Sequence, residues 1–195
     1  MRIILASGSP RRKKLLKQLN CNFNIIIPSV DESLIKTDIK PEEYCTNLAT
    51  KKAHEISQNN PNALIIGADT IVTLENEILE KPNNKLDAIN MLSFLSSKTH
   101  KVLTGVCLIW PIKKIKHVFF ETTFVSFKAL DKREIEYYVN NYTPYDKAGS
   151  YGIQDWSAIF VNEIKGCYNN VVGFPLSRFY IELKNLNINL LEKKS

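Results

Sequence analysis

Short apolar runs alternate along the chain with segments in which apolar residues recur every three or four positions. The runs predict strands at residues 3–6, 23–28, 63–66, 70–74, 101–110, 116–128 and 158–164. The recurring segments predict one helix that begins at about residue 10, helices at about 41–58, 85–97 and 131–142, and a last helix from 175 onward. This alternation indicates an α/β fold. The two long strands that meet at residues 111–114 form a hairpin, which favours a mixed sheet over a purely parallel one.

The composition is that of one globular domain spanning residues 1–195. Of these residues, 44% are hydrophobic and 24% are charged, which is enough to bury a sizeable core. The N-terminal apolar run is too short for a signal peptide, and no segment approaches the roughly 20 apolar residues that span a bilayer. We therefore expect a soluble, cytoplasmic protein without a membrane partner.

The cysteines and the net charge narrow the range of partners. Four cysteines lie far apart without a Cys-x-x-Cys pair, and three histidines are not at ligand spacing, so neither a zinc site nor a redox motif is indicated. A net charge of +6 suits nucleic acid, an anionic membrane or a small polyanion such as a triphosphate. The Lys-Lys pairs are spread along the chain, which makes nucleic acid the weaker interpretation.

The first predicted helix begins with charges that its dipole disfavours. Ser9 is a good N-cap, and Pro10 is a good first helical residue. Arg11 and Arg12 therefore fall in the first turn, where each cation costs roughly 0.3–1 kcal/mol unless an anion binds there. With Ser7 and Ser9 in the preceding loop, the arginines predict a phosphate-binding cradle that lacks the spacing of a Walker A motif. The alternative is a capped helix with solvated arginines.

A lysine interrupts the apolar face of the second predicted helix. Tyr44, Leu48 and Ile56 lie on one stripe of this helix, and Lys52 falls on the same stripe, whereas Lys51 points away. Lys52 therefore needs a partner. It either extends to the surface along its alkyl stem or reaches an anion held over the sheet.

Asp69 is the only charged residue in the apolar segment from Ala63 to Leu74. We expect it at the end of a core strand, where Gly67 and Ala68 leave room beside it. A carboxylate in that place can bind a metal or accept a proton from water. The alternative is a turn-forming aspartate that caps local N–H groups.

Two further segments complete the candidate chemistry. Lys81 and Glu32 lie in turn-like compositions that carry little weight alone, but with Lys52, the arginines and Asp69 they supply cations for phosphate and carboxylates for a metal. The glycine-containing loop at 146–154 ends in Gln154. Its amide can pair with the edge of uracil or thymine, although an amide can also turn to suit other bases.

Seven segments in this order resemble the Maf family of nucleotide pyrophosphatases, and together they cover nearly the whole chain. They lie at residues 5–12 (Leu-Ala-Ser-Gly-Ser-Pro-Arg-Arg), 31–32 (Asp-Glu), 48–53 (Leu-Ala-Thr-Lys-Lys-Ala), 67–70 (Gly-Ala-Asp-Thr), 80–82 (Glu-Lys-Pro), 146–154 (Asp-Lys-Ala-Gly-Ser-Tyr-Gly-Ile-Gln) and 170–176 (Asn-Val-Val-Gly-Phe-Pro-Leu). Seven motifs in register are far more specific than any one of them.

The resemblance implies a fold, an assembly and an activity. The fold is an elongated mixed α/β sheet with flanking helices that form two lobes around a central cleft, similar to inosine triphosphate pyrophosphatases. The assembly is a homodimer. The activity is hydrolysis of a nucleoside triphosphate to its monophosphate and pyrophosphate.

The resemblance also implies residue roles. Asp69 matches the family's proton acceptor, and the other catalytic-pocket positions match Glu32, Lys52 and Lys81. The substrate-selecting positions match Arg11, Thr70 and Gln154. The Ser-Tyr-Gly-Ile-Gln segment resembles the branch that acts on dTTP and UTP, whereas Asp155-Trp156-Ser157 departs from the glycine-containing stretch that many members carry there.

Our hypothesis is that Glu32 and Asp69 hold Mg²⁺, or alternatively Mn²⁺, while Arg12, Lys52 and Lys81 neutralise the phosphates. Two alternatives stay open on the sequence alone. One is a non-catalytic nucleotide- or nucleic-acid-binding regulator of septum formation, and the other is a pyrophosphatase of the 7-methyl-GTP type.

Overall fold

One mixed β-sheet runs through the protein in the computed structural model, which describes residues 1–30, 39–75 and 77–190. Its strand order is β2-β1-β3-β5-β6-β7, and β4 pairs with β3. The strands are β1 (Arg2–Ala6), β2 (Asn24–Ile25), β3 (Ala63–Leu74), β4 (Glu77–Leu79), β5 (Thr99–Trp110), β6 (Ile115–Phe127) and β7 (Val161–Lys165). β1 is parallel to β2 and β3, and the other pairs are antiparallel, so the predicted mixed sheet is confirmed.

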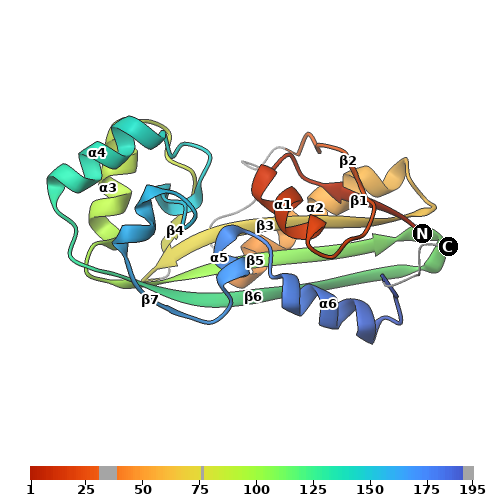
Figure 1. Ribbon diagram of the computed structural model, residues 1–195. Helices are drawn as coiled ribbons and strands as arrows, with labels where there is room; N and C mark the ends of the chain where they lie inside the picture. Colours follow the sequence, from red (N-terminus) through yellow and green to blue (C-terminus); the bar gives the residue numbers. More distant parts are fainter. Residues whose placement is uncertain (31–38, 76, 191–195) are drawn as a thin grey trace.

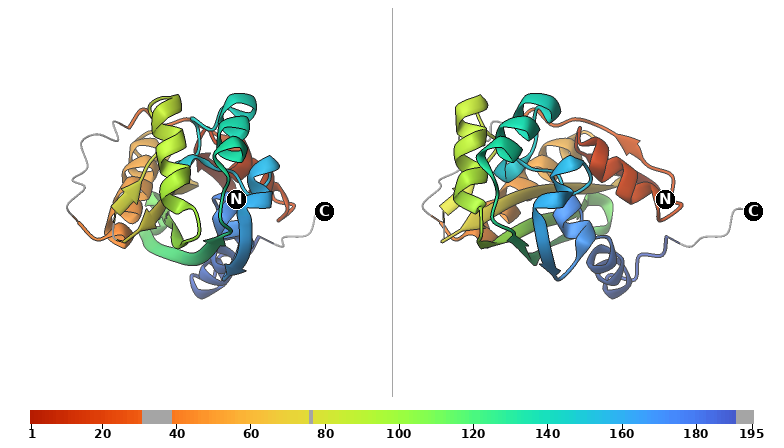
Figure 2. Two further views of the ribbon diagram at one scale, coloured as in Figure 1. Left: turned by 90° about the vertical axis from the view of Figure 1, so that its left-hand side faces the viewer. Right: turned by 60° about the vertical axis from the view of Figure 1, so that its left-hand side comes forward.

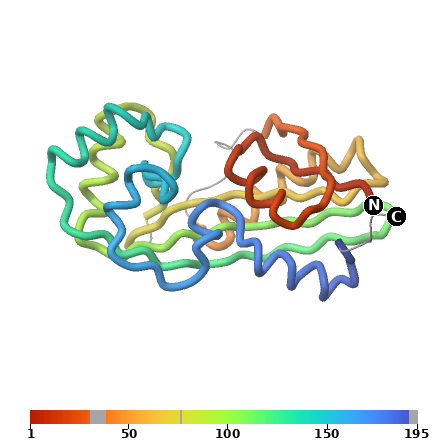
Figure 3. The backbone as a smooth tube through the Cα atoms, in the orientation of Figure 1, coloured from red at the N-terminus to blue at the C-terminus, as the bar shows by residue number. Residues whose placement is uncertain are grey.

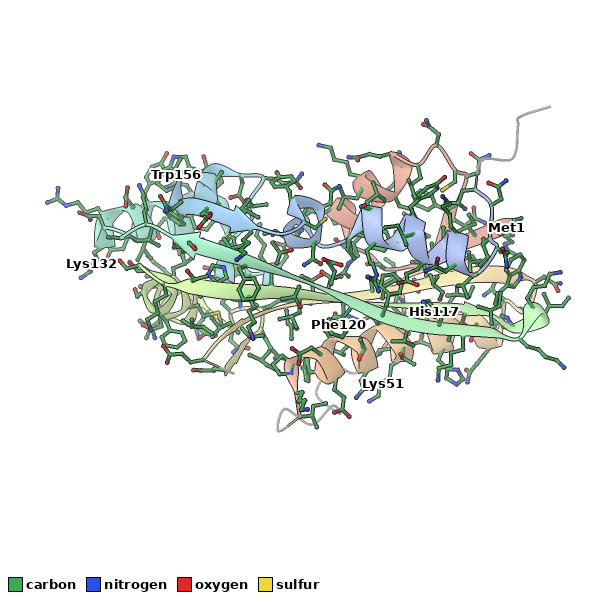
Figure 4. The ribbon with its side chains drawn as sticks, turned by 90° about the horizontal axis from the view of Figure 1, so that it is seen from below. Met1, Lys51, His117, Phe120, Lys132 and Trp156 are labelled. Atoms are coloured by element: carbon green, nitrogen blue, oxygen red, sulfur yellow. The ribbon has the colours of Figure 1, made fainter. Side chains whose placement is uncertain are left out.

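Helices cover both faces of the sheet. They are α1 (Pro10–Lys17), α2 (Pro41–Gln58), α3 (Lys85–Leu95), α4 (Lys132–Tyr142), α5 (Tyr168–Val172) and α6 (Leu176–Asn185), with short 3-10 turns η2 (Pro111–Lys113), η3 (Ala148–Ser150) and η4 (Trp156–Phe160). Seen from below, α2 lies on one side of the sheet and α5 and α6 lie on the other (Figure 4). Within the described ranges, no helix combines the length and the apolar character needed to cross a membrane.

The molecule is elongated and has two lobes (Figure 1). β1, β2, α1 and α2 belong to one lobe, while α3 and α4 lie side by side at the far end of the other (Figure 2). The backbone trace shows β5 and β6 running the length of the molecule and joining the lobes (Figure 3). One pocket is lined by residues of both lobes. The predicted fold class, with two lobes around a central cleft, is confirmed.

The largest hydrophobic core continues from one lobe into the other. It includes Leu15 of α1 and Phe179 of α6 as well as Leu92 of α3 and Tyr138 of α4. Two smaller clusters fill the space between α2 and the opposite face of the sheet. Because the lobes share the main core, each supports the packing of the other.

Two glycines allow α2 to lie unusually close to the sheet. A Cβ on Gly67 of β3 would stand 2.2 Å from the carbonyl oxygen of Ala49, and one on Gly105 of β5 would stand 2.5 Å from that of Cys45. Any larger residue would force the helix away. The space expected beside Asp69 at Gly67 is therefore filled by the α2 backbone.

Capping residues in the sequence predicted most of the helix ends correctly. Ser9 caps α1, and Asp131 and Glu134 form the expected capping box at the start of α4. Three strand predictions were wrong in detail. Residues 63–74 form one continuous strand, β2 covers only Asn24–Ile25, and residues 156–160 form η4 before β7 begins at Val161. The strand β3 continues through Gly67 and Asp69 because β5 pairs with it without interruption from Ile65 to Thr73.

Candidate functional site

A pocket of about 620 Å³ lies in the cleft between the lobes. It gathers the residues predicted from the sequence, apart from Glu32, which lies outside the described residues. These are Ser7, Ser9, Arg11, Arg12, Lys52, Asp69, Thr70, Lys81 and Gln154. Residues that lie up to 147 positions apart in the sequence, from Ser7 to Gln154, therefore line one cavity.

The pocket opens at an interruption in the sheet. Along one edge of β3, β1 pairs with residues as far as Gly67, and β4 pairs with residues from Val72 onward. Asp69 and Thr70 lie between these two pairings and line the pocket. Because side chains alternate along a strand, Asp69 faces α2 with Gly67, whereas Thr70 faces the opposite side of the sheet. The interruption thus gives the pocket access to both faces of β3.

Asp69 forms a buried ion pair with Lys52. Lys52 Nζ lies 2.6 Å from Asp69 Oδ1, and the two residues are only 9% and 7% exposed. Asp69 lies in the middle of β3, which corrects the expectation that it ends a strand, and a turn-capping role is excluded by its strand conformation. Lys52 does not extend to the surface. The close approach of α2 over Gly67 brings the lysine to the carboxylate.

Arg12 is held by neutral oxygen atoms from three parts of the chain. Its Nε donates to the Gly173 carbonyl oxygen at 2.9 Å, one terminal nitrogen donates to Thr70 Oγ1 at 3.0 Å, and the other donates to Ser7 Oγ at 3.3 Å. Ser9 caps the helix by accepting from the Arg12 backbone N–H at 3.4 Å. The guanidinium is therefore fixed beside the pocket, in contrast to a fully solvated arginine.

Arg11 joins the two lobes across the pocket. Its Nη1 lies 2.7 Å from Asp146 Oδ2, and its Nη2 donates to the Asp146 carbonyl oxygen at 3.1 Å. Lys147 Nζ contacts the other oxygen of Asp146 at 2.9 Å. Burial opposes ionisation of Asp146, but the hydrogen bonds from Lys147 and Arg11 outweigh it and hold the pKa of this carboxyl below its usual value.

The loop that carries Gln154 is anchored from behind. Ser157 is fully buried, accepts from the Gly152 N–H at 3.1 Å and donates to the Gly152 carbonyl oxygen at 2.9 Å. Trp156 packs against Tyr138 and Tyr142 in near-parallel stacks. The Asp155-Trp156-Ser157 segment therefore supports the loop, while the Gln154 side chain stays exposed at the pocket.

The family model for Maf-like proteins matches residues 2–186. This chain belongs to the Maf family. Relatives named dTTP/UTP pyrophosphatase support the same assignment: one from Bacillus anthracis is 48% identical over 189 residues, which is 97% of each chain. Another from Ruminiclostridium cellulolyticum is 44% identical over 190 residues, covering 97% of this chain and 98% of the relative.

Two solved structures are also similar to this Maf-family chain. The Staphylococcus aureus Ham1 protein aligns with a TM-score of 0.45 and 15% identity, covering 65% of this chain and 72% of that one. The nucleoside-triphosphatase, or dITP/XTP pyrophosphatase, of Mycobacterium abscessus aligns with a TM-score of 0.40 and 15% identity, covering 67% and 76%.

Several residues in or behind the pocket of this Maf-family chain received no role from the sequence. Asp146 and Lys147 lie within a recognised motif, yet only the structure shows that they contact each other and Arg11. Gly173 contributes through its backbone carbonyl oxygen. Every residue type carries such an oxygen, so the sequence could not indicate this contact. Thr104 on β5 hydrogen-bonds Thr70 from behind the pocket and lies in an ordinary apolar strand pattern.

The donor set of the pocket suits a hard cation held partly by substrate. Asp69 offers carboxylate oxygen inside the pocket. No three His, Cys, Asp or Glu side chains gather as a metal cluster in the described part of the chain. Mg²⁺ is commonly held by one or two carboxylates together with phosphate oxygens, and the residues present fit that mode.

Proposed function

We propose that this protein is a nucleoside triphosphate pyrophosphatase that hydrolyses dTTP and UTP to the monophosphate and pyrophosphate. The observation that carries the proposal is the convergence of Arg12, Lys52 and Lys81 with Asp69 in one pocket. A triphosphate chain needs several cations to offset its charge, and these residues supply them. The relatives named dTTP/UTP pyrophosphatase support the same substrate class.

In the proposed reaction, a water oxygen attacks the α-phosphorus and the bond from that phosphorus to the bridging oxygen breaks. Pyrophosphate leaves with the electron pair of that bond. Arg12, Lys52 and Lys81 offset the negative charge that the phosphate oxygens carry from binding onward. Asp69 accepts or directs the proton that the water loses, because its carboxylate lies in the pocket beside the cations.

We further propose that Asp69 and Glu32 hold a divalent cation, with Mg²⁺ preferred and Mn²⁺ as the alternative. When bound, such a cation would offset phosphate charge and raise the acidity of the attacking water. Turnover should therefore disappear when EDTA is added and return with Mg²⁺ or Mn²⁺. Full turnover in EDTA would contradict this part of the proposal.

Base selection is assigned to Gln154, and Arg11 and Thr70 are assigned to substrate binding in the same pocket. The exposed Gln154 amide lies on a supported loop at the pocket, where it can pair with the N–H and an adjacent carbonyl of a uracil or thymine ring. A panel of UTP, dTTP, CTP, GTP and 7-methyl-GTP, assayed for pyrophosphate with wild type and Gln154→Ala, should show pyrimidine preference only in wild type. A wild-type preference for 7-methyl-GTP would overturn the assignment.

The decisive test compares two buried carboxylates. Asp69→Asn should lower pyrophosphate release from UTP by about 10²–10⁴-fold, the range typical of a lost acid or base. Glu182→Gln is the matched control, because Glu182 is 6% exposed and paired with His117 and Arg178 outside the pocket. Thermal melts verify folding of both variants. UTP binding without any pyrophosphate release by wild type would instead support a non-catalytic regulator.

We also propose that residues 1–195 act as one cytoplasmic domain that assembles as a homodimer. The shared core of the two lobes supports the single domain. Light scattering at micromolar concentration should give twice the chain mass of 22.3 kDa. A monomer that retains full turnover would remove the dimer from the proposal.

A further inference from the structure

Behind the pocket, a row of hydroxyl groups connects Arg12 to the interior. Arg12 donates to Thr70 Oγ1 at 3.0 Å, and Thr70 Oγ1 lies 3.0 Å from Thr104 Oγ1. Thr104 Oγ1 in turn lies 3.3 Å from the backbone oxygen of Asn170. Thr104 is fully buried on β5 and does not line the pocket.

The chemistry of the two ends sets the direction of this row. A guanidinium can only donate, so Thr70 must accept from Arg12. A backbone carbonyl can only accept, so the single Thr104 proton points to Asn170. Thr104 is then an acceptor toward Thr70, and the Thr70 proton turns to it. Each hydroxyl thus donates away from the pocket and accepts from the pocket side.

This orientation of the hydroxyl groups favours the contact between Thr70 and Arg12. Because Thr70 directs its own proton to Thr104, it presents lone pairs to the guanidinium. The Gly173 carbonyl, 3.3 Å from Thr70 Oγ1, is then left to accept from Arg12 Nε at 2.9 Å. Without the Thr104 hydroxyl, Thr70 would donate its proton to the Gly173 carbonyl oxygen. Thr70 and Arg12 Nε would then share this one acceptor.

A purely structural role for Thr104 is the competing explanation. Its bond to Asn170 would then serve to attach α5 to the sheet. The Asn170 side chain already performs that attachment, because its Nδ2 donates to Val102 O at 3.0 Å, to Glu121 O at 3.2 Å and to Thr123 Oγ1 at 3.1 Å. Burying a hydroxyl group costs more free energy than burying the methyl group of a valine, which would also fit this strand. The presence of threonine therefore indicates that its hydrogen bonds have a role.

We propose that Thr104 is a positioning residue for phosphate binding, acting through Thr70 to hold the Arg12 guanidinium in place. The inference rests on the proposed function, in which Arg12 contacts the triphosphate. It predicts that Thr104 affects the phosphate part of the substrate equally for every base.

The test uses near-isosteric variants. Thr104→Val removes the hydroxyl and should raise KM for UTP and dTTP by roughly fivefold, the value of one neutral hydrogen bond, with kcat within about twofold of wild type. Thr104→Ser keeps the hydroxyl and should restore the wild-type KM. Thr73→Val is the matched control, since Thr73 is a buried threonine of β3 outside the pocket, and its KM should not change. If Thr104→Val does not fold, Thr104→Ala against Thr104→Ser gives the same comparison.

A binding measurement separates this inference from the proposed function. Calorimetry with tripolyphosphate and with an α,β-methylene UTP analogue should show that Thr104→Val weakens the binding of both ligands by the same factor. If wild type hydrolyses UTP but Thr104→Val binds and turns over as wild type does, the positioning role is wrong and the function stands. If wild type releases no pyrophosphate while Thr104→Val still weakens binding, the function is wrong and the positioning role stands. An altered ranking of bases would also contradict the positioning role.

Discussion

The pair of Lys52 and Asp69 shows how two buried charges depend on each other. Removing one partner of a buried ion pair typically costs about 3–5 kcal/mol. Lys52→Met should therefore lower the free energy of unfolding by about that amount. Lys51→Met is the matched control, because Lys51 is exposed on the outer side of α2 (Figure 4), and it should change stability by less than about 0.5 kcal/mol. Equal urea midpoints for the two variants would contradict the interpretation.

His100 is the residue from which we expect a pH effect on stability. The residue is 1% exposed, its Nε2 lies 2.8 Å from the Tyr151 hydroxyl, and burial lowers its pKa to about 4. The unfolded chain, with an ordinary histidine pKa of about 6.5, binds more protons than the folded one between these values. Stability should therefore fall as the pH falls from 6.5 to 4.

The measurement is urea unfolding across that range for wild type and His100→Gln. The glutamine amide can still contact Tyr151 but does not titrate. As the pH falls, the free energy of unfolding of wild type should decrease by up to about 1.4 kcal/mol more per pH unit than that of the variant. Carboxyl groups whose pKa is lowered, such as Glu182, contribute equally to both proteins. Parallel pH profiles would show that His100 is not the source.

At the scale of the elements, the contact between α2 and β3 determines where Lys52 lies. Gly67→Ala would place a methyl group 2.2 Å from the Ala49 carbonyl oxygen, and backbone on both sides leaves little room for relaxation. We expect a loss of about 1–3 kcal/mol in stability, as for other overpacked sites. Gly8→Ala is the comparison for stability alone, because its added Cβ would meet the flexible end of Ile27 at 3.3 Å. If the two substitutions cost the same, α2 is held less tightly than the structure indicates.

Element boundaries were predictable where the signal was local. Ser9 with Pro10 and Asp131 with Glu134 marked their helices because a cap depends on side chains within three residues of the helix end. The break expected inside residues 63–74 was wrong because pairing with β5 outweighed the low strand propensity of Gly67 and Asp69.

At the scale of the molecule, the two lobes should unfold together. β5 and β6 extend through both lobes (Figure 1), and one hydrophobic core connects them. The two tryptophans report on the two ends, since Trp110 ends β5 next to the hairpin and Trp156 packs on α4 in the other lobe (Figure 4). In Trp110→Phe and in Trp156→Phe, the fluorescence midpoint in urea should coincide with the far-UV circular dichroism midpoint. Separate midpoints would indicate independently folding lobes.

The sequence by itself determined the α/β class, the order of the elements and the set of chemical groups, because these follow from hydrophobic periodicity, local caps and motifs read along the chain. It also identified Lys52 and Asp69 as charged residues within otherwise apolar patterns. Only the tertiary structure decided that they are each other's partners, that Arg11 reaches Asp146, and that the interruption beside β3 opens a pocket there. These contacts join residues 17 and 135 positions apart. Such distances are bridged by strand pairing and helix packing, which leave no local pattern in the chain.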